Sequence, residues 1–441
     1  MTENVTRENL HRLRNPRLRA YAERYAAIYE EFEEAVQQAG LPLEPTDRSA
    51  EADALRAELR AGGTSFRNAG HSIHLGPISP ACEACRKGVG TATFFASLKC
   101  HRRCFYCFNP NQQGYDFFQG HRRDLAAELT ELAESGCQVG HLALTGGEPL
   151  LFPEEAAGFF QTARRLFPGV HTRLYTSGDH LNEALLRQLA DAGLDEVRIS
   201  VRVDDGAAGR RHTYDRIALA REYIPAVMVE TPVLPGTLDV MEEMLLELDR
   251  IGIFGVNLLE FCFPFHNAGA FRERGYQIKN PPYEVPYDYW YAGGLPVAGS
   301  ELDALRLLRF ALDRGLSMGV HYCSLENKHS GQIYQQNADA VLPETACFSE
   351  RDFFIRSAKV FGRDAIRARK QFDAIGYGGY TADPVHGFLE FHPARIPDLR
   401  GLDVEVALCT YVQEERAEGR VLRELKVALT TPESFDPDTD I

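Results

Sequence analysis

The fold of this chain follows from one stretch, Leu98-Lys99-Cys100-His101-Arg102-Arg103-Cys104-Phe105-Tyr106-Cys107-Phe108. Its cysteines are spaced C-x3-C-x2-C, and three thiolates in such a loop can surround one iron–sulfur cluster. Three ligands leave one iron of a four-iron cluster open, which indicates that a small molecule binds there. A zinc loop or a chance grouping of cysteines are the alternatives that this stretch alone leaves open.

A second motif follows the cysteine loop. A helix-like stretch over residues 124–136 precedes the apolar run His141-Leu142-Ala143-Leu144, which has the pattern of a buried strand. The run leads into Thr145-Gly146-Gly147-Glu148-Pro149. Two glycines let the backbone approach a ligand closely, and Glu148 supplies an acceptor for an ammonium group.

The two motifs, in this order, resemble those of the radical S-adenosylmethionine (SAM) superfamily. The resemblance implies that Cys100, Cys104 and Cys107 hold a 4Fe-4S cluster whose open iron is chelated by the amine and carboxylate of SAM. It also implies that residues 146–149 bind the methionine amine. An electron donor, which we expect to be a flavodoxin, a ferredoxin or a dedicated reductase, would reduce the cluster.

Composition limits the class of protein. The chain has 441 residues and 44% hydrophobic residues, which suits a barrel of about 200–250 residues with additions at both ends. A formal charge of −15 argues against nucleic acid as the main partner, because phosphate binding needs a basic surface. No apolar run approaches membrane-spanning length, and residues 1–19 contain no signal-peptide core, so we expect a cytoplasmic protein.

Strand-like and helix-like segments alternate after the cysteine loop. The expected strands are residues 93–98, 141–144, 171–175, 196–201, 225–230, 255–260 and 317–322. The expected helices between them are residues 153–167, 182–192, 216–222, 239–251 and 302–314. Repeated β–α units predict a parallel sheet. We therefore expect an α/β protein with a partial (β/α)6 radical SAM barrel, as the resemblance also implies.

Four regions are expected along the chain. Residues 1–66 form a helical extension, with an apolar stripe that includes Tyr21 and Tyr25, and residues 67–92 form a cysteine-containing metal loop. Residues 93–325 form the barrel, with an aromatic-rich insertion at 261–300 that is a lid, a substrate wall or a packing element. Residues 326–441 end in a small α+β appendage, with strand-like runs at 388–391, 404–411 and 422–429.

Polar residues follow several of the expected strands, and in parallel barrels the chemistry gathers at the carboxyl ends of the strands. By resemblance, Ser177, Ser200 and Arg202 would contact the ribose or carboxylate of SAM, although capping and loop roles are alternatives. Glu230 and Glu260 end neighbouring strands, and buried acids must be paired or functional. We expect both glutamates to act on the substrate.

Further segments narrow the resemblance. Ile78-Ser79-Pro80-Ala81-Cys82-Glu83-Ala84-Cys85, Leu259-Glu260-Phe261 and His321-Tyr322-Cys323 look like a little-characterised radical SAM group related to the pyruvate formate-lyase activating enzyme. The similarity covers roughly residues 70–340 and indicates a scaffold without indicating a substrate. Lys328, which follows the last of these segments, is a third candidate catalytic residue.

The remaining cysteines include a predicted second metal site. Cys82 and Cys85 form a C-x2-C pair on a turn bounded by proline and glycine, which is the geometry of half a metal site. Cys323 and Cys347 would complete a structural four-thiolate site for iron or zinc. An auxiliary iron–sulfur cluster and ordinary thiols are the alternatives.

Three classes of function compete. We expect hydrogen abstraction from a small natural-product or sugar-like substrate, for example a diol dehydration or an amino-sugar deoxygenation by a lyase or oxidoreductase. The alternative is modification of a peptide or protein, including glycyl-radical activation. An iron–sulfur sensor or electron carrier is the third class, and the intact Gly-Gly-Glu-Pro motif argues against it.

Overall fold

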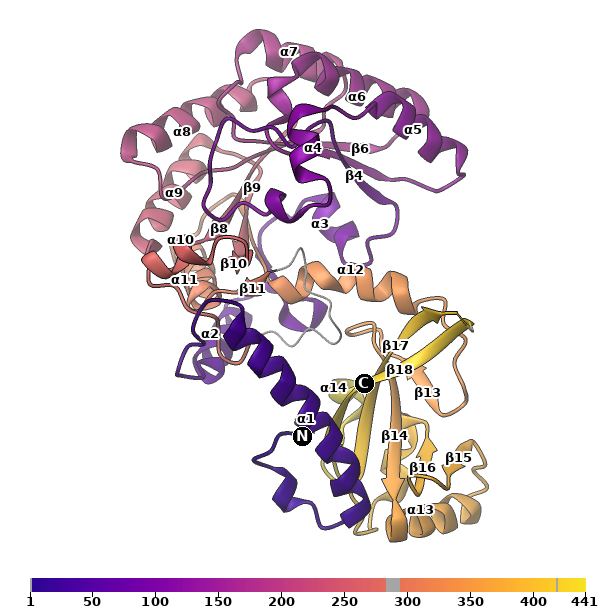
Figure 1. Ribbon diagram of the computed structural model, residues 1–441. Helices are drawn as coiled ribbons and strands as arrows, with labels where there is room; N and C mark the ends of the chain where they lie inside the picture. Colours follow the sequence, from indigo (N-terminus) through magenta and orange to yellow (C-terminus); the bar gives the residue numbers. More distant parts are fainter. Residues whose placement is uncertain (1, 283–293, 418) are drawn as a thin grey trace. The chain divides into compact units, whose positions relative to one another are not determined.

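The computed structural model describes residues 2–282, 294–417 and 419–441, which divide into two units. The barrel unit comprises residues 39–282 and 294–331, and the terminal unit comprises residues 2–38 and 332–441 (Figure 1). The described residues contain no helix that is both long and apolar enough to cross a membrane. Each unit is described by itself.

The barrel unit is built on a nine-stranded sheet in the order β2-β3-β12-β9-β8-β7-β6-β5-β4. Neighbouring strands pair in parallel throughout the run β12-β9-β8-β7-β6-β5-β4. At the other edge of the sheet, β3 is antiparallel to β12 and β2 is antiparallel to β3. The bounds are β2 (Ser65–Arg67), β3 (Ser72–Leu75), β4 (Thr91–Phe95), β5 (His141–Thr145), β6 (His171–Thr176), β7 (Glu196–Ile199), β8 (Ala226–Val233), β9 (Gly255–Glu260) and β12 (Gly319–Cys323). The expected α/β partial barrel is confirmed, and β12 adds a parallel strand after the sixth β–α unit.

The helices of the barrel unit are α2 (Ser49–Ala61), α3 (Pro80–Cys85), α4 (Tyr115–Gly120), α5 (Leu125–Glu134), α6 (Pro153–Leu166), α7 (Glu183–Asp191), α8 (Ala207–Arg221), α9 (Leu238–Ile251), α10 (Ala268–Glu273) and α11 (Ser300–Arg314). Those that connect successive parallel strands, such as α6, α7 and α9, run along the outer side of the sheet (Figure 1), whereas α3 lies against the inner face. A short hairpin of β10 (Cys262–Phe263) and β11 (Leu295–Pro296) follows β9, and α12 (Leu325–Asn337) follows β12.

Local sequence explains where several helices begin and end. The Asn182 side chain caps α7 by accepting a hydrogen bond from the backbone N–H of Leu185. Gly252 ends α9 in the left-handed conformation, with φ +79°. Helix α8 begins nine residues before the predicted helix at 216–222, because its first turns are polar and carry no apolar stripe for a sequence pattern to detect.

The two faces of the parallel sheet differ in chemistry. Neighbouring residues in register point to the same face, and side chains alternate along each strand. The outer face is apolar and packs on the helices; for example, the Phe94 ring of β4 lies 5.6 Å from the Phe159 ring of α6. The other, inner face is polar and carries Arg173, Tyr175, Glu196, Arg198, Glu230, Asn257 and His321.

The terminal unit contains a seven-stranded antiparallel sheet in the order β1-β18-β17-β14-β16-β15, with β13 also paired to β14. The strands are β1 (Glu3–Asn4), β13 (Ala346–Phe348), β14 (Ile355–Phe361), β15 (Tyr380–Asp383), β16 (Phe388–Phe391), β17 (Val406–Arg416) and β18 (Gly419–Thr430). Its helices are α1 (Pro16–Gln38), α13 (Gly362–Ala374) and α14 (Pro437–Asp440). Helix α1 belongs to this unit and α2 to the barrel unit.

A buried charge pair joins α1 to the sheet of the terminal unit. Lys359 of β14 is 4% exposed and forms an ion pair with Glu424 of β18. The Glu424 carboxylate also accepts hydrogen bonds from the hydroxyls of Tyr21 (2.7 Å), Tyr25 (2.5 Å) and Tyr411 (2.7 Å). Burial alone would raise the pKa of Glu424, but the charge of Lys359 and these hydrogen bonds lower it.

Replacement of Lys359 by methionine should lower the free energy of unfolding by about 3–5 kcal/mol, because it leaves a buried carboxylate without its cation. Urea unfolding of the purified protein measures this loss. The double variant Lys359→Met/Glu424→Gln should lose less than the sum of the two single variants. Additive effects would contradict a direct interaction between the two side chains.

Candidate functional site

The cysteine loop is held against the end of β5 by backbone hydrogen bonds. The N–H of Gly147 donates to the carbonyl of Ser97 (3.0 Å), and the N–H of Glu148 donates to the carbonyl of Lys99 (2.8 Å). Ser97 and Lys99 lie three residues and one residue before Cys100. The Gly-Gly-Glu-Pro motif therefore continues the β4–β5 contact beyond the strands and fixes the start of the loop.

The two glycines make this close approach possible. A Cβ atom on Gly147 would lie 2.0 Å from the carbonyl oxygen of Lys99, and one on Gly146 would lie 2.5 Å from that of Ser97. Gly146 also has a φ of +124°, which side chains rarely adopt. The far end of the loop is fixed to the same motif, since Asn109 Nδ2 donates to the Gly146 carbonyl (2.8 Å).

The three cysteines of the loop lie close together. Burial raises the pKa of each thiol, and a neighbouring thiol raises it further: Cys104 acts on Cys100, Cys107 on Cys104, and Cys100 on Cys107. Within the described residues, no three His, Cys, Asp or Glu side chains converge on a single metal ion. The thiolates of a 4Fe-4S cluster bind different irons and need not meet at one point. Three neighbouring thiols on a loop fixed at both ends therefore fit such a cluster.

Charged side chains fix the cysteine loop to the ends of β6 and β7. Arg102 donates to the Asp179 carboxylate from Nε (2.5 Å) and Nη2 (2.6 Å), and to Asp205 from Nη1 (3.0 Å). His101 Nε2 lies 2.6 Å from Asp179 Oδ2. Burial alone would raise the pKa of Asp179, but the hydrogen bonds from Arg102 and His101 hold it well below its usual range.

Glu148 is buried, and its carboxylate accepts four hydrogen bonds. Oε1 accepts from the backbone N–H of Leu150 (3.1 Å) and from the hydroxyl of Thr176 (2.7 Å). Oε2 accepts from the backbone N–H (2.8 Å) and the hydroxyl (2.6 Å) of Ser177. Glu148 and Ser177, both predicted to bind SAM, are therefore in direct contact, and the carboxylate is oriented by the end of β6.

Arg202 and Ser200, the other predicted SAM contacts, differ in their surroundings. Arg202 donates to Asp204 from Nη2 (2.9 Å) and lies close enough to Cys104 to lower the pKa of that thiol, although burial keeps the value above its ordinary level. Ser200 follows β7, and its side chain is exposed. The structure thus brings Arg202 to the cysteine loop, whereas Ser200 faces open space.

The described part of the aromatic insertion supports the cysteine loop from the other side. The Phe105 ring lies 5.2 Å from the Phe271 ring and 6.1 Å from the Phe261 ring, and the Tyr106 ring lies 5.7 Å from that of Phe261. Asn267 Nδ2 donates to the Phe105 carbonyl (2.8 Å). These residues pack against the loop. The aromatic residues of the insertion at 283–293 lie outside the described residues.

Glu230 belongs to a charged network on the inner face. Arg198, which is 3% exposed, donates to Glu196 Oε1 from Nε (2.6 Å) and to Glu230 Oε2 from Nη1 (2.6 Å). Asn257 Nδ2 also donates to Glu230 Oε2 (3.0 Å). The side chain of Glu230 is 19% exposed, so its carboxylate is held in place and still accessible.

The inner face also carries buried polar atoms that have no hydrogen-bond partner in the described structure. They are Asn257 Oδ1, His321 Nδ1 and Arg173 Nε, in residues that are 4%, 3% and 7% exposed. Burial lowers the pKa of His321 to about 3, which keeps the imidazole neutral at pH 7. Because buried polar groups are normally paired, these atoms indicate that a polar ligand or water binds on this face.

Glu260 occupies the opposite face of the sheet. Glu230 is in register with Asn257, and Glu260 comes three residues later, so the two carboxylates point to different sides. Glu260 Oε1 lies 3.2 Å from Lys279 Nζ, and Oε2 accepts from the backbone N–H of Leu325 (2.8 Å). Burial raises the pKa of Glu260 to about 7. The two predicted catalytic glutamates therefore do not form one site.

Three of the four cysteines predicted for a second metal site lie together in the barrel unit. Cys82 and Cys85 are on α3, and Cys323 ends β12. Burial raises the pKa of Cys323 to about 12; the nearby Lys328 lowers it, and the thiols of Cys85 and Cys82 raise it. Lys328 thus lies beside these thiols, on the inner side of the barrel. Cys347 lies on β13 in the terminal unit.

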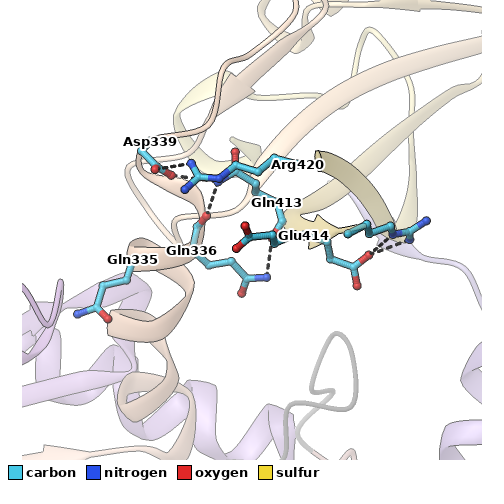
Figure 2. A pocket seen from close by; sticks show the side chains of 8 residues that line it. Gln335, Gln336, Asp339, Gln413, Glu414 and Arg420 are labelled. Carbon is cyan, nitrogen blue, oxygen red and sulfur yellow. Dashed lines mark hydrogen bonds and ion pairs between the residues drawn. The ribbon is translucent and has the colours of Figure 1, made fainter. Parts of the chain in front are cut away.

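The terminal unit has a pocket of about 600 Å³ at the β17–β18 hairpin. Figure 2 shows that its charged groups pair with each other, as in the contact of Arg420 with Asp339 (2.6 Å). It is lined by Gln335, Gln336, Asp339, Gln413, Glu414, Glu415, Arg416 and Arg420. None of the predicted site residues lines this pocket.

Sequence reasoning missed several residues that build the site. Arg198, Asn257 and Asp179 were not among the candidates. Arg198 and Asn257 could have been found from the sequence, because each is a polar residue between two apolar residues of its strand. In Glu196-Val197-Arg198 the polar residues also recur at every second position, which places them on one face of the sheet. Asp179 gave no such signal, since its pairing with Arg102 joins residues far apart in the sequence.

Residues 96–248 match the family model described as the Radical SAM superfamily. This region includes the cysteine loop, the Gly-Gly-Glu-Pro motif and the strands that support them. Residues 96–248 are thus a radical SAM domain, and the fold and cysteine motif of this region are those of the superfamily that cleaves SAM reductively with a 4Fe-4S cluster.

The chain is also similar to particular proteins. A protein of Methanocaldococcus jannaschii named "Putative glycyl-radical enzyme activating enzyme MJ0021" is 26% identical over 298 residues, which cover 65% of this chain and 75% of the relative. Among solved structures, SuiB from Streptococcus suis is 11% identical with a TM-score of 0.39 and matches 75% of this chain and 66% of its own. The methyltransferase TsrM from Kitasatospora setae is 17% identical with a TM-score of 0.34, over 57% of this chain and 53% of its own. The chain spans about half the length of most of the solved structures that it matches.

Replacement of Gly147 by alanine should reduce cluster incorporation several-fold, because the added methyl group would collide with the Lys99 carbonyl and displace the cysteine loop. Iron and sulfide analysis after anaerobic reconstitution measures the loss. Gly158→Ala is the matched control, since Gly158 lies in α6 and a Cβ there meets nothing within 4 Å. Equal iron contents in the two variants would contradict the role given to this contact.

Proposed function

We propose that this radical SAM enzyme acts on a small polar substrate, of the sugar-like or amino-bearing natural-product class, bound at the inner face of the barrel. The observation that carries the proposal is Glu230. Its carboxylate is fixed by Arg198 and Asn257, and its side chain remains 19% exposed. An ionised carboxylate held in this way suits an ammonium or hydroxyl group of a substrate.

The remainder of the inner face supports a substrate with several polar groups. Asn257, His321 and Arg173 each contribute a buried polar atom that a hydroxyl-rich molecule would satisfy. Helix α3 covers the inner face near the start of β7, where Ser79 donates to Glu196 Oε2 (2.6 Å). A face closed at the amino ends of the strands suits a small molecule better than a peptide that passes through the barrel.

The residues of this chain have separable roles in the proposed reaction. When bound, the cluster and SAM supply the one-electron chemistry of the family, with an electron from a flavodoxin, a ferredoxin or a dedicated reductase. Arg102 and Gly147 hold the cysteine loop in position, and Phe105 and Phe261 exclude water from one side of it. Glu230 binds the substrate and accepts a proton at its carboxylate where the reaction releases one.

Activation of a glycyl-radical enzyme is the second candidate function. The observation that favours it is the name of the Methanocaldococcus jannaschii relative. The substrate would then be a glycine-containing loop of a partner protein. Such a loop would have to reach the cysteine loop from the carboxyl ends of the strands, because α3 covers the inner face near the amino end of β7.

Replacement of Cys100, Cys104 and Cys107 together by alanine should abolish SAM cleavage, because the cysteines that remain are not on the loop beside Gly147. The assay is 5′-deoxyadenosine formation by the reduced, reconstituted protein. Cys137→Ala removes an exposed thiol outside the loop and should retain the activity. Undiminished product from the triple variant would exclude the proposed site of SAM cleavage.

Replacement of Glu230 by glutamine should raise the KM for a cationic or polyol substrate about tenfold or more, because it removes a charge-assisted contact worth about 1.5–3 kcal/mol. Substrate-stimulated SAM cleavage with a panel of amino sugars and polyols provides the measurement. Glu131→Gln, at an exposed position of α5, is the matched control. If only a glycyl-radical protein stimulates SAM cleavage, the small-molecule proposal fails and the second candidate function holds.

A further inference from the structure

Three thiols from two distant parts of the chain meet on the inner side of the barrel. Cys323 lies two residues after His321 on β12 and therefore shares the inner face with it. Cys82 and Cys85 lie on α3, which is held to the same face because Ser79 bonds to both Glu196 (2.6 Å) and Arg198 (3.1 Å). The backbone thus brings the C-x2-C pair to the end of β12.

Helix α12 fixes the position of the pair relative to Cys323. It begins two residues after Cys323, and Ser330 on it donates to the carbonyl of Arg86 (3.1 Å). A Cβ atom on Gly331 would lie 2.9 Å from the carbonyl oxygen of Cys85. The end of α3 therefore packs directly on the helix that follows Cys323.

Nitrogen atoms donate hydrogen bonds to two of the three thiols. Arg198 Nη2 donates to Cys82 Sγ (3.3 Å), and Asn327 Nδ2 donates to Cys323 Sγ (3.2 Å). Lys328 lies near both Cys85 and Cys323. Buried neutral thiols need no cations, whereas thiolates bound to iron are stabilised by N–H donors and positive charge.

We propose that Cys82, Cys85 and Cys323 bind a second 4Fe-4S cluster on the inner face of the barrel, with Arg198 and Asn327 as hydrogen-bond donors to its thiolates. Structural zinc takes four protein ligands, whereas three thiolates are enough to hold a 4Fe-4S cluster with one iron open. Arg198 donates to both Cys82 Sγ (3.3 Å) and Glu230 Oε2 (2.6 Å), so Glu230 lies beside this site. The fourth iron would take its oxygen ligand from a hydroxyl group of the substrate.

This site differs from the four-thiolate site predicted from the sequence. Cys347 is on β13 of the terminal unit, where its charged neighbours are Arg356 and Asp352. The barrel unit alone supplies three thiols, the number that leaves one iron open. A structural site closed by a fourth cysteine would leave the fourth position unavailable to an oxygen ligand.

Iron and acid-labile sulfide per chain, measured after anaerobic reconstitution of the full-length protein, test the proposal. The unmodified protein should bind about eight irons, and the Cys82→Ala and Cys323→Ala variants about four. The triple variant of the cysteine loop should also bind about four, and its combination with Cys82→Ala/Cys85→Ala/Cys323→Ala should bind none. Cys347→Ala and Cys137→Ala are the matched controls and should bind about eight.

The cluster in the triple variant of the cysteine loop provides an independent readout. Its reduction potential, followed by electron paramagnetic resonance, should fall when Arg198→Met removes the positive donor to Cys82. Arg198→Lys retains the charge and should restore most of the potential. A purely structural role for Arg198 would leave the potential of the folded variants unchanged.

Three results would overturn the proposal. They are about four irons in the unmodified protein, zinc without sulfide in the triple variant of the cysteine loop, and unchanged iron in Cys82→Ala. The iron count of the unmodified protein decides the question even where a variant fails to fold. If the second cluster is absent and SAM cleavage persists, this proposal fails while the proposed function stands.

Discussion

The contact between Gly147 and the carbonyl of Lys99 is the constraint on which the rest of the site depends. The backbone of one strand end lies so close to the start of the cysteine loop that no side chain fits between them. The hydrogen bond from Glu148 to the same carbonyl fixes the direction of the loop. The ion pairs of Arg102 and the aromatic contacts of Phe105 then hold a loop whose start is already determined. The Gly-Gly-Glu-Pro motif and the cysteine loop therefore act as one structural element, although many residues separate them in the sequence.

Electrostatics distinguishes the two faces of the parallel sheet. Arg198 is almost completely buried, and the free-energy cost of removing its charge from water is offset by the carboxylates of Glu196 and Glu230 on either side. Buried ion pairs contribute little to net stability compared with apolar packing. A polar face with unpaired atoms is therefore better explained by the binding of a ligand than by a contribution to the stability of the fold. The outer face carries Glu260 in a closed environment with Lys279, where it serves the packing of the barrel.

The sequence predicts those features that depend on local pattern. The alternation of strands and helices was predicted because each buried strand is a continuous apolar run between helical segments. The cysteine loop and the Gly-Gly-Glu-Pro motif were predicted because both are short and contiguous. The faces of Glu230 and Glu260 were not predicted, because they depend on the register between β8 and β9. The start of α8 was missed because its first turns lack an apolar stripe. The packing of α1 on the sheet of the terminal unit was also missed. Tyr21 and Tyr25 of α1 donate hydrogen bonds to Glu424, and no local pattern links residues that are about 400 positions apart.

The pairing of β1 with β18 sets an order for the biosynthesis of this protein. Residues 3 and 4 complete a sheet whose partner strand is residues 419–430, so β1 leaves the ribosome more than 400 residues before the strand with which it pairs. During that interval the apolar side of α1, with Leu18 and Ala22, has no sheet to cover it. The barrel unit can form earlier, because its strands follow one another along the chain. Nascent chains of this protein therefore need protection of helix α1 until residues 419–430 have been synthesised.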